Sequence, residues 1–92
     1  NGSVDGAAHG NVVIDDFASI TAAAGTDGIR GFNYGTGTIT ITVEAGADVN
    51  GPRDGVGAFA KDGGNVSVTN HGSVTGGVAA IDAQTTGSAT AT

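Results

Sequence analysis

The sequence predicts an all-β chain wound as a right-handed parallel β-helix (β-solenoid) of about three to four coils, with roughly 27 residues per coil. Short stretches of alternating apolar and polar residues recur at a fixed spacing, and 18 glycines punctuate a chain whose apolar residues are mostly Ala, Val and Ile. Small β-branched residues and frequent glycine suit short strands joined by tight turns. Residues that build long helices are scarce, which argues against a helical bundle.

The repeat becomes visible when Gly10, Gly37 and Gly64 are aligned, because they lie 27 residues apart. Each glycine precedes a short alternation, which reads NVVID, TITIT and NVSVT in turn. A further alternation, SATAT, follows Gly87, 23 residues after Gly64. We therefore expect coils that start near residues 10, 37, 64 and 87. Residues 1–92 are predicted to form a single β-solenoid segment, a fragment of a longer repeat array.

The aligned apolar residues are expected to stack in columns. Alternate side chains of a strand point to opposite faces, so one set lies inside the coil. One coil cannot bury its own apolar face, and stacked coils supply both the core and the backbone pairing. The expected columns are Val12 with Ile39 and Val66, Ile14 with Ile41 and Val68, Ile20 with Ala47 and Val74, Ile29 with Val56, and Phe32 with Phe59.

Glycine is expected at the corners between strands, where the backbone needs a positive φ. The pairs Asp27-Gly28 and Asp54-Gly55 are predicted to be turns. Pro52 is also expected in a corner, because its missing N–H then costs no hydrogen bond of the ladder.

The two ends of the chain carry weaker forms of the repeat. NGSVDG at residues 1–6 is similar to HGSVTG at residues 71–76, so Val4 is expected to take the place of Val74. In the short third coil, Val78 and Ile81 are expected to replace the stretch 56–59. Two other folds remain open at this point, an antiparallel sandwich and a disordered low-complexity chain. The sandwich does not explain the fixed spacing of 27, and disorder does not explain the regular apolar positions.

The formal net charge is −6, from nine acidic and three basic residues. Such a chain repels phosphate groups, so we expect no nucleic-acid partner. No apolar run approaches the length that crosses a bilayer, so no membrane insertion of this segment is expected. The absence of cysteine fits export through an oxidising periplasm, and it also fits many cytosolic proteins.

The stretch DGVGAFAKDGGNVSVTNHGSVTGGVAAIDAQTTG resembles the β-helical passenger repeats of bacterial autotransporters and related surface adhesins. Those repeats combine a Gly-Gly pair, alternating Val and Thr, an Asn-x-Gly turn and a Val/Ile-Thr-Gly turn. The resemblance implies a stalk that is extracellular or lies on the bacterial outer surface. It also implies contact with a host surface or a glycan.

Catalytic chemistry is not expected from the side chains. Hydrolysis of a glycosidic bond needs two carboxylates across the sugar, and the aligned columns place no second carboxylate opposite Asp15 or Asp16. His9 and His71 lie in separate turns without further ligands at metal-binding spacing. We therefore expect a protein that is not an enzyme and that needs no cofactor or metal.

The leading functional hypothesis is a structural or adhesive segment, a rigid stalk or spacer. Its uncapped coil ends are expected to associate with further copies of the chain. The alternative is a ligand- or ice-binding flat face built on a ladder of outward hydroxyl groups. The residues of this ladder are Thr40, Thr42, Ser67, Thr69, Thr90 and Thr92.

Overall fold

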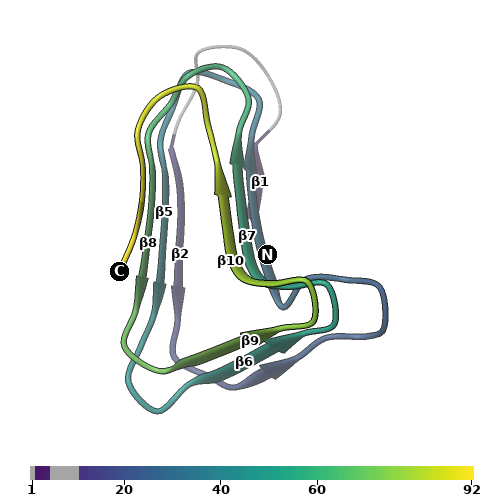
Figure 1. The fold of residues 1–92 in the computed structure, drawn as a ribbon. Coiled ribbons are helices and arrows are strands. Elements are labelled where there is room, and N and C mark those ends of the chain that lie inside the picture. Colours follow the sequence, from purple (N-terminus) through teal and green to yellow (C-terminus); the bar gives the residue numbers. More distant parts are fainter. Residues whose placement is uncertain (1, 5–10) are drawn as a thin grey trace.

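A computed structural model describes residues 2–4 and 11–92, which form an all-β structure with parallel sheets (Figure 1). This part of the chain contains no helix. The strands are β1 Gly2–Val4, β2 Val12–Asp16, β3 Ile20–Thr21, β4 Ile29–Asn33, β5 Ile39–Val43, β6 Asp48–Gly51, β7 Asp54–Ala60, β8 Val66–Asn70, β9 Ser73–Gly76, β10 Ala79–Gln84 and β11 Ala89–Ala91.

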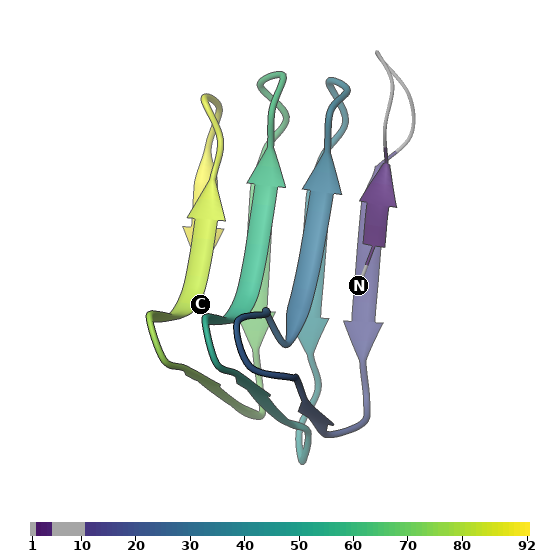
Figure 2. The same cartoon turned by 90° about the vertical axis from the view of Figure 1, so that its right-hand side faces the viewer.

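The strands are arranged in three sheets. Sheet A has the order β1-β4-β7-β10, sheet B the order β11-β8-β5-β2, and sheet C the order β3-β6-β9. Every pair within a sheet is parallel, and each strand pairs with the strand three places along the chain. The chain therefore visits sheets B, C and A in turn, and corresponding strands lie side by side (Figure 2).

Most of the expected columns are confirmed. Strand register places Ile39 between Val12 and Val66, and Ile41 between Ile14 and Val68. The same register extends to the last coil, where Ala89 pairs with Val66. The core between the sheets is made of small side chains, and its largest fully buried apolar members are Ile29, Ile39, Ile41, Val43, Val49, Val56, Val66 and Val68.

Sheet C departs from the spacing of 27, and here the sequence alignment is wrong. Ile20 pairs with Val49, which in turn pairs with Val74, whereas Ala47 was expected in this column. Residues 44–47 form a longer connection before β6 than those before β3 and β9, and Gly46 adopts a φ of 86° there. A longer loop between β3 and β4 compensates, so Ile29 again pairs with Val56 across 27 residues.

The Asp-Gly pairs are not turns of positive φ, which corrects a second expectation. Asp54 and Gly55 begin β7, and among the described residues the positive-φ glycines are Gly25, Gly46 and Gly63. A Cβ at Gly55 would lie 2.4 Å from Val74 Cγ1 and 2.7 Å from the Ala80 carbonyl oxygen. Close stacking of the next coil, and not a left-handed turn, therefore requires glycine at this position. Pro52 does lie in a corner outside the ladder, as predicted.

The end regions also differ from expectation. Val4 pairs with Asn33 in sheet A and not in the column of Val74, because β1 extends the sheet of β4. The similar hexapeptides at residues 1–6 and 71–76 therefore do not occupy equivalent places in the fold. Ile81 does pair with Val56, but Val78 is 78% exposed at the corner before β10. The coil start near residue 10 lies outside the described residues.

Candidate functional site

The hydroxyl ladder predicted from the sequence lies on the outer face of sheet B. Thr40 pairs with Ser67, and Ser67 with Thr90, while Thr42 pairs with Thr69. The backbone of Thr92 exchanges hydrogen bonds with β8, so this residue continues the column of Thr69. The structure thus brings the six residues together. Val13 and Asp15 occupy the corresponding positions of the first coil.

The aligned columns hold no second carboxylate, as expected, because Asp15 pairs with Thr42 and Asp16 with Val43. Outside these columns, Asp15 interacts with the carboxyl group of Glu44, which directly follows the neighbouring strand β5. A side-chain hydrogen bond with Asp15, then burial and the charge of Asp15, raise the pKa of Glu44. The carboxyl groups of a glycosidase flank the scissile bond about 5 Å or more apart, whereas Glu44 and Asp15 interact directly with each other, which does not match that arrangement. The aligned columns missed Glu44 because it lies beyond the end of the strand.

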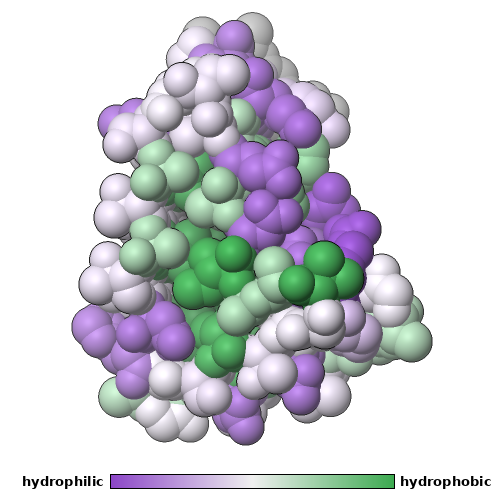
Figure 3. Space-filling view, in the orientation of Figure 1, coloured by the Kyte–Doolittle hydropathy of each residue, from purple (hydrophilic) through white to green (hydrophobic). Residues whose placement is uncertain are grey.

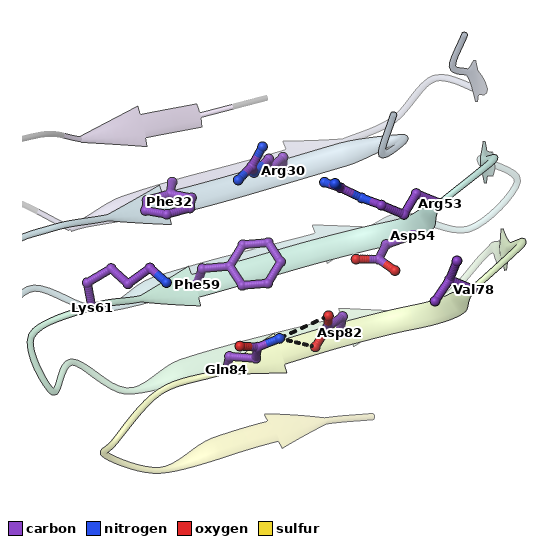
Figure 4. Close-up of a pocket in the computed structure, with 9 residues that line it drawn as sticks. All are labelled: Arg30, Phe32, Arg53, Asp54, Phe59, Lys61, Val78, Asp82 and Gln84. Carbon is purple, nitrogen blue, oxygen red and sulfur yellow. Dashed lines mark hydrogen bonds between the residues drawn. The ribbon is translucent and has the colours of Figure 1, made fainter. Parts of the chain in front are cut away.

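The other candidate site is on the outer face of sheet A. Strand register places Arg30, Gly57 and Asp82 in one outward row across three coils. Gly57 has no side chain, so the Phe59 ring and the Asp27 carboxylate occupy the space beside it in this row. A Cβ added there would lie 2.8 Å from Phe59 Cε2, so the ring lies against the bare backbone. This face carries a hollow of about 430 Å³, which we call the sheet A hollow (Figure 4).

Aromatic rings form one side of the sheet A hollow. Phe32 and Phe59 pair across β4 and β7, with ring centroids 5.7 Å apart. Tyr34 extends this group, because its ring centroid lies 4.6 Å from that of Phe32. The chain has only these rings and Phe17. The sheet A face therefore holds three of the four Phe and Tyr rings of the chain.

Positive charge gathers at the same place. All three basic residues of the chain, Arg30, Arg53 and Lys61, line the sheet A hollow, although the net charge of the chain is −6. The Arg30 Cζ lies 5.0 Å from the Phe32 centroid and 5.5 Å from that of Phe59. The Lys61 Nζ lies 5.2 Å from the Phe32 centroid. Such distances are typical of cations held over ring faces.

Arg53 is held by a bidentate ion pair with Asp27. Its Nε and Nη2 donate to the two carboxylate oxygens at 3.0 and 3.2 Å. Burial by itself would raise the pKa of Asp27, but hydrogen bonds from the Arg53 guanidinium and the Asp54 amide outweigh it, together with the charges of Arg53 and Arg30. The pKa of Asp27 is therefore lowered. The pair fixes Arg53 at the rim of the hollow and links two neighbouring coils.

Acceptor groups complete the wall opposite the rings. Asp82 accepts two hydrogen bonds from the Gln84 amide nitrogen, each 3.1 Å long (Figure 4). Asp54 is only 4% exposed. Burial first, then the charges of Asp27 and Asp82, raise the pKa of the Asp54 carboxyl. The sheet A hollow thus offers cations, ring faces and hydrogen-bond acceptors on adjacent strands.

Replacing Asp54 with asparagine is expected to stabilise the protein at pH 7 and to have little effect at pH 3. A carboxyl group whose pKa is raised by folding contributes its full stability below the unfolded pKa, and this stability is lost as pH rises through the folded pKa. Asparagine does not titrate and escapes that loss. Urea unfolding at both pH values measures the difference.

Asp62→Asn is the matched control for this change, because it removes one carboxylate from an exposed site. It should change stability little at either pH. A less stable Asp54→Asn variant at pH 7 would contradict the assigned effect of burial.

The sequence alignment paired Phe32 with Phe59 but did not identify them as part of a surface site. Both are half-buried. Each lies three residues after an inward residue of its strand, Ile29 or Val56, and an odd spacing along a strand puts the two side chains on opposite faces. That spacing was the signal that could have placed the rings outside. No sequence signal indicated that Arg30, Arg53 and Lys61 lie close together. Arg53 and Lys61 lie just outside the ends of β7, where the shape of the corners sets the positions of the side chains.

Comparison with protein-family models, curated proteins and solved structures finds no match for this chain. Within residues 2–4 and 11–92, no group of three or more His, Cys, Asp or Glu side chains is placed to hold a metal ion. The same part of the chain has no helix that is long and apolar enough to cross a bilayer.

Proposed function

We propose that this chain is a segment of a right-handed parallel β-helix that serves as a rigid stalk or spacer, without catalysis. The path of the chain supports the handedness. In Figure 1 the chain descends along β8, crosses along β9 and ascends along β10, while coils nearer the C-terminus lie in front. A chain that runs counter-clockwise as it approaches the viewer is winding in the right-handed sense.

The observation that carries the spacer role is the continuity of the buried columns across coils. Ile41 lies directly between Ile14 and Val68, and the backbone of each coil hydrogen-bonds to the next. Stability in such an array comes from neighbouring coils, so length can grow without a new core. A close-packed interior also resists bending, which is the mechanical property that a spacer needs.

The extracellular or bacterial outer-surface location belongs to the same proposal. It is supported by the resemblance of residues 54–87 to autotransporter passenger repeats. The acidic composition supports a segment that stays clear of nucleic acids and anionic lipid.

A spacer built from coils should accept a further coil at its open end. The last described coil leaves Val74, Ile81 and Ala83 only partly buried. Figure 3 shows hydrophobic residues gathered in the middle of this face, surrounded by polar ones. Open strand edges above apolar side chains favour pairing with another strand. We therefore propose that isolated copies of the chain associate through this end.

Two lysine substitutions on β11 test this association. Ala91 pairs with Val68 and shares its inward column, whereas Thr90 pairs with Ser67 and shares the outward one. Both residues are exposed, and both substitutions change the net charge equally. Sedimentation velocity should show wild-type protein and Thr90→Lys associating as concentration rises. Ala91→Lys should remain monomeric, because it places a charge over the open core.

Two results would overturn the association and with it the open-ended spacer. One is a wild-type protein that stays monomeric at the highest concentration, and the other is an equal effect of both lysines. The second function predicted from the sequence, a ligand- or ice-binding face on the hydroxyl ladder, stays a prediction. Val13 and Asp15 interrupt its array in the first coil, so we do not adopt it.

A further inference from the structure

We propose that the sheet A hollow binds an acidic sugar, a pyranose ring that carries a carboxylate or a sulfate. Its volume of about 430 Å³ lies within the range of small-molecule sites, which is about 300–1,000 Å³. The inference rests on three kinds of group that strand register brings together here. It is independent of the spacer role.

The first group is an aromatic surface. The ring of Phe59 lies between Arg30 on one neighbouring strand and Asp82 with Gln84 on the other (Figure 4). The Phe59 ring packs directly on the backbone of Gly57, which has no side chain. The apolar C–H face of a pyranose buries surface when it packs on such a ring. A second ring, that of Phe32, extends the apolar surface by one strand.

The second group is the cations. Arg53 already pairs with Asp27. Within the described part of the chain, Arg30 and Lys61 form no ion pair, and they lie over aromatic rings instead. Their N–H donors are therefore available to an anion that approaches the ring edge. An arginine guanidinium matches the geometry of a carboxylate or sulfate, and charged hydrogen bonds of this kind are the strong ones.

The third group is the acceptors, and it decides the class of ligand. Asp82 and Gln84 face the rings from β10, one strand beyond Phe59. An aromatic carboxylate or a bare anion has no hydroxyl group to donate to them, and Asp82 would repel it. A sugar satisfies both sides, because its hydroxyls donate to Asp82 while its acidic group meets Arg30.

The overall charge argues against a long polyanion. Only three cations are available, and the other charges of the chain are nine acidic residues. Nucleic-acid binding draws on many phosphate contacts spread over a basic surface. This chain has a single basic location beside acceptors. The match is therefore to one acidic ring, alone or within a mostly neutral glycan.

A titration followed by amide NMR tests the proposal. The probes are a hexuronate trisaccharide, a sulfated hexose trisaccharide, the neutral hexose trisaccharide of the same linkage, benzoate and sodium sulfate. The acidic sugars should shift the Gly57 and Phe59 amides and leave those of Thr40 and Thr69 unchanged. At least one acidic sugar should bind about tenfold or more tightly than the neutral one, as expected for one charged hydrogen bond.

Three variants complete the design. Arg30→Gln removes the cation, and Phe59→Leu removes the ring but keeps an apolar side chain. Each should weaken binding of the acidic sugar about tenfold. Thr42→Glu lowers the net charge by the same amount as Arg30→Gln, but on sheet B. It should leave the affinity within about twofold, because distant surface charges are screened.

Several outcomes would overturn the proposal. Equal binding of the neutral trisaccharide would remove the role of the anionic group. Equal binding of benzoate or sulfate would show a site for anions and not for sugars. The absence of shifts at Gly57 and Phe59, or an equal loss of affinity in Thr42→Glu, would show that the hollow is not the site. Hexuronate and sulfated probes distinguish the two anionic groups, and tight binding of either supports the class.

Discussion

Ile41→Ala is expected to lower the free energy of unfolding by about 2–5 kcal/mol, the usual cost of truncating a buried isoleucine. Ile41 is fully buried in the middle of its column, between Ile14 and Val68. Its Cδ1 reaches across the interior to within 3.1 Å of where a Gly31 side chain would begin on sheet A. Alanine would leave a cavity between two sheets that backbone pairing prevents from closing.

Equilibrium urea unfolding measures this loss. Thr42→Ala is the matched control, because it lies one residue further on the outer face of the same strand. It should change stability by less than about 0.5 kcal/mol. Should Ile41→Ala fail to fold, Ile41→Val provides the measurement, with an expected cost of about 0.5–1.5 kcal/mol. Equal effects at positions 41 and 42 would contradict the assignment of inward and outward faces.

Gly64→Ala is expected to cost at least as much as the upper end of the usual range for overpacking, about 1–3 kcal/mol. A Cβ at Gly64 would lie 1.8 Å from the Gly37 carbonyl oxygen and 2.6 Å from its carbon. Both clashing atoms belong to the backbone of the preceding coil, so no side chain can rotate away. The two coils would have to separate where they are hydrogen-bonded.

Gly46→Ala is the control for this substitution. Gly46 has a φ of 86° and open space around it, so alanine there meets backbone strain without a clash. That strain costs about 1–2 kcal/mol. Urea unfolding of both variants should therefore rank Gly64→Ala as the more damaging. The reverse order would show that the coils at Gly37 and Gly64 are further apart than the structure places them.

The sequence by itself determined the all-β class and the parallel stacking. Alternation of Val, Ile and Thr is a local signal, and its recurrence at a fixed spacing indicates that the same pattern lies in each coil. Val12, Ile39 and Val66 could be placed in one column for that reason. The hydroxyl ladder followed from the same register, because outward positions repeat whenever inward ones do.

Only the tertiary structure decided how the corners are built. The longer loop after β3 belongs to one coil and the longer turn before β6 to the next, and the two differences offset each other. The spacing of 27 therefore survives in sheets A and B on either side and conceals the shift in sheet C. Val49 therefore replaced Ala47 in the column of Ile20. Corner lengths are set by how neighbouring coils pack and not by any local preference, and this is why the alignment missed the shift.

The sheet A hollow also needed the tertiary structure. Alternation puts Phe32 and Phe59 on the face opposite Ile29 and Val56, so it indicates outward rings, but it does not show that they line a hollow. Arg30, Arg53 and Lys61 are separated along the chain and come together because stacking sets neighbouring coils side by side. The periodic part of the sequence therefore specified the scaffold. The chemistry on its surface arose from contacts between coils, which no single coil contains.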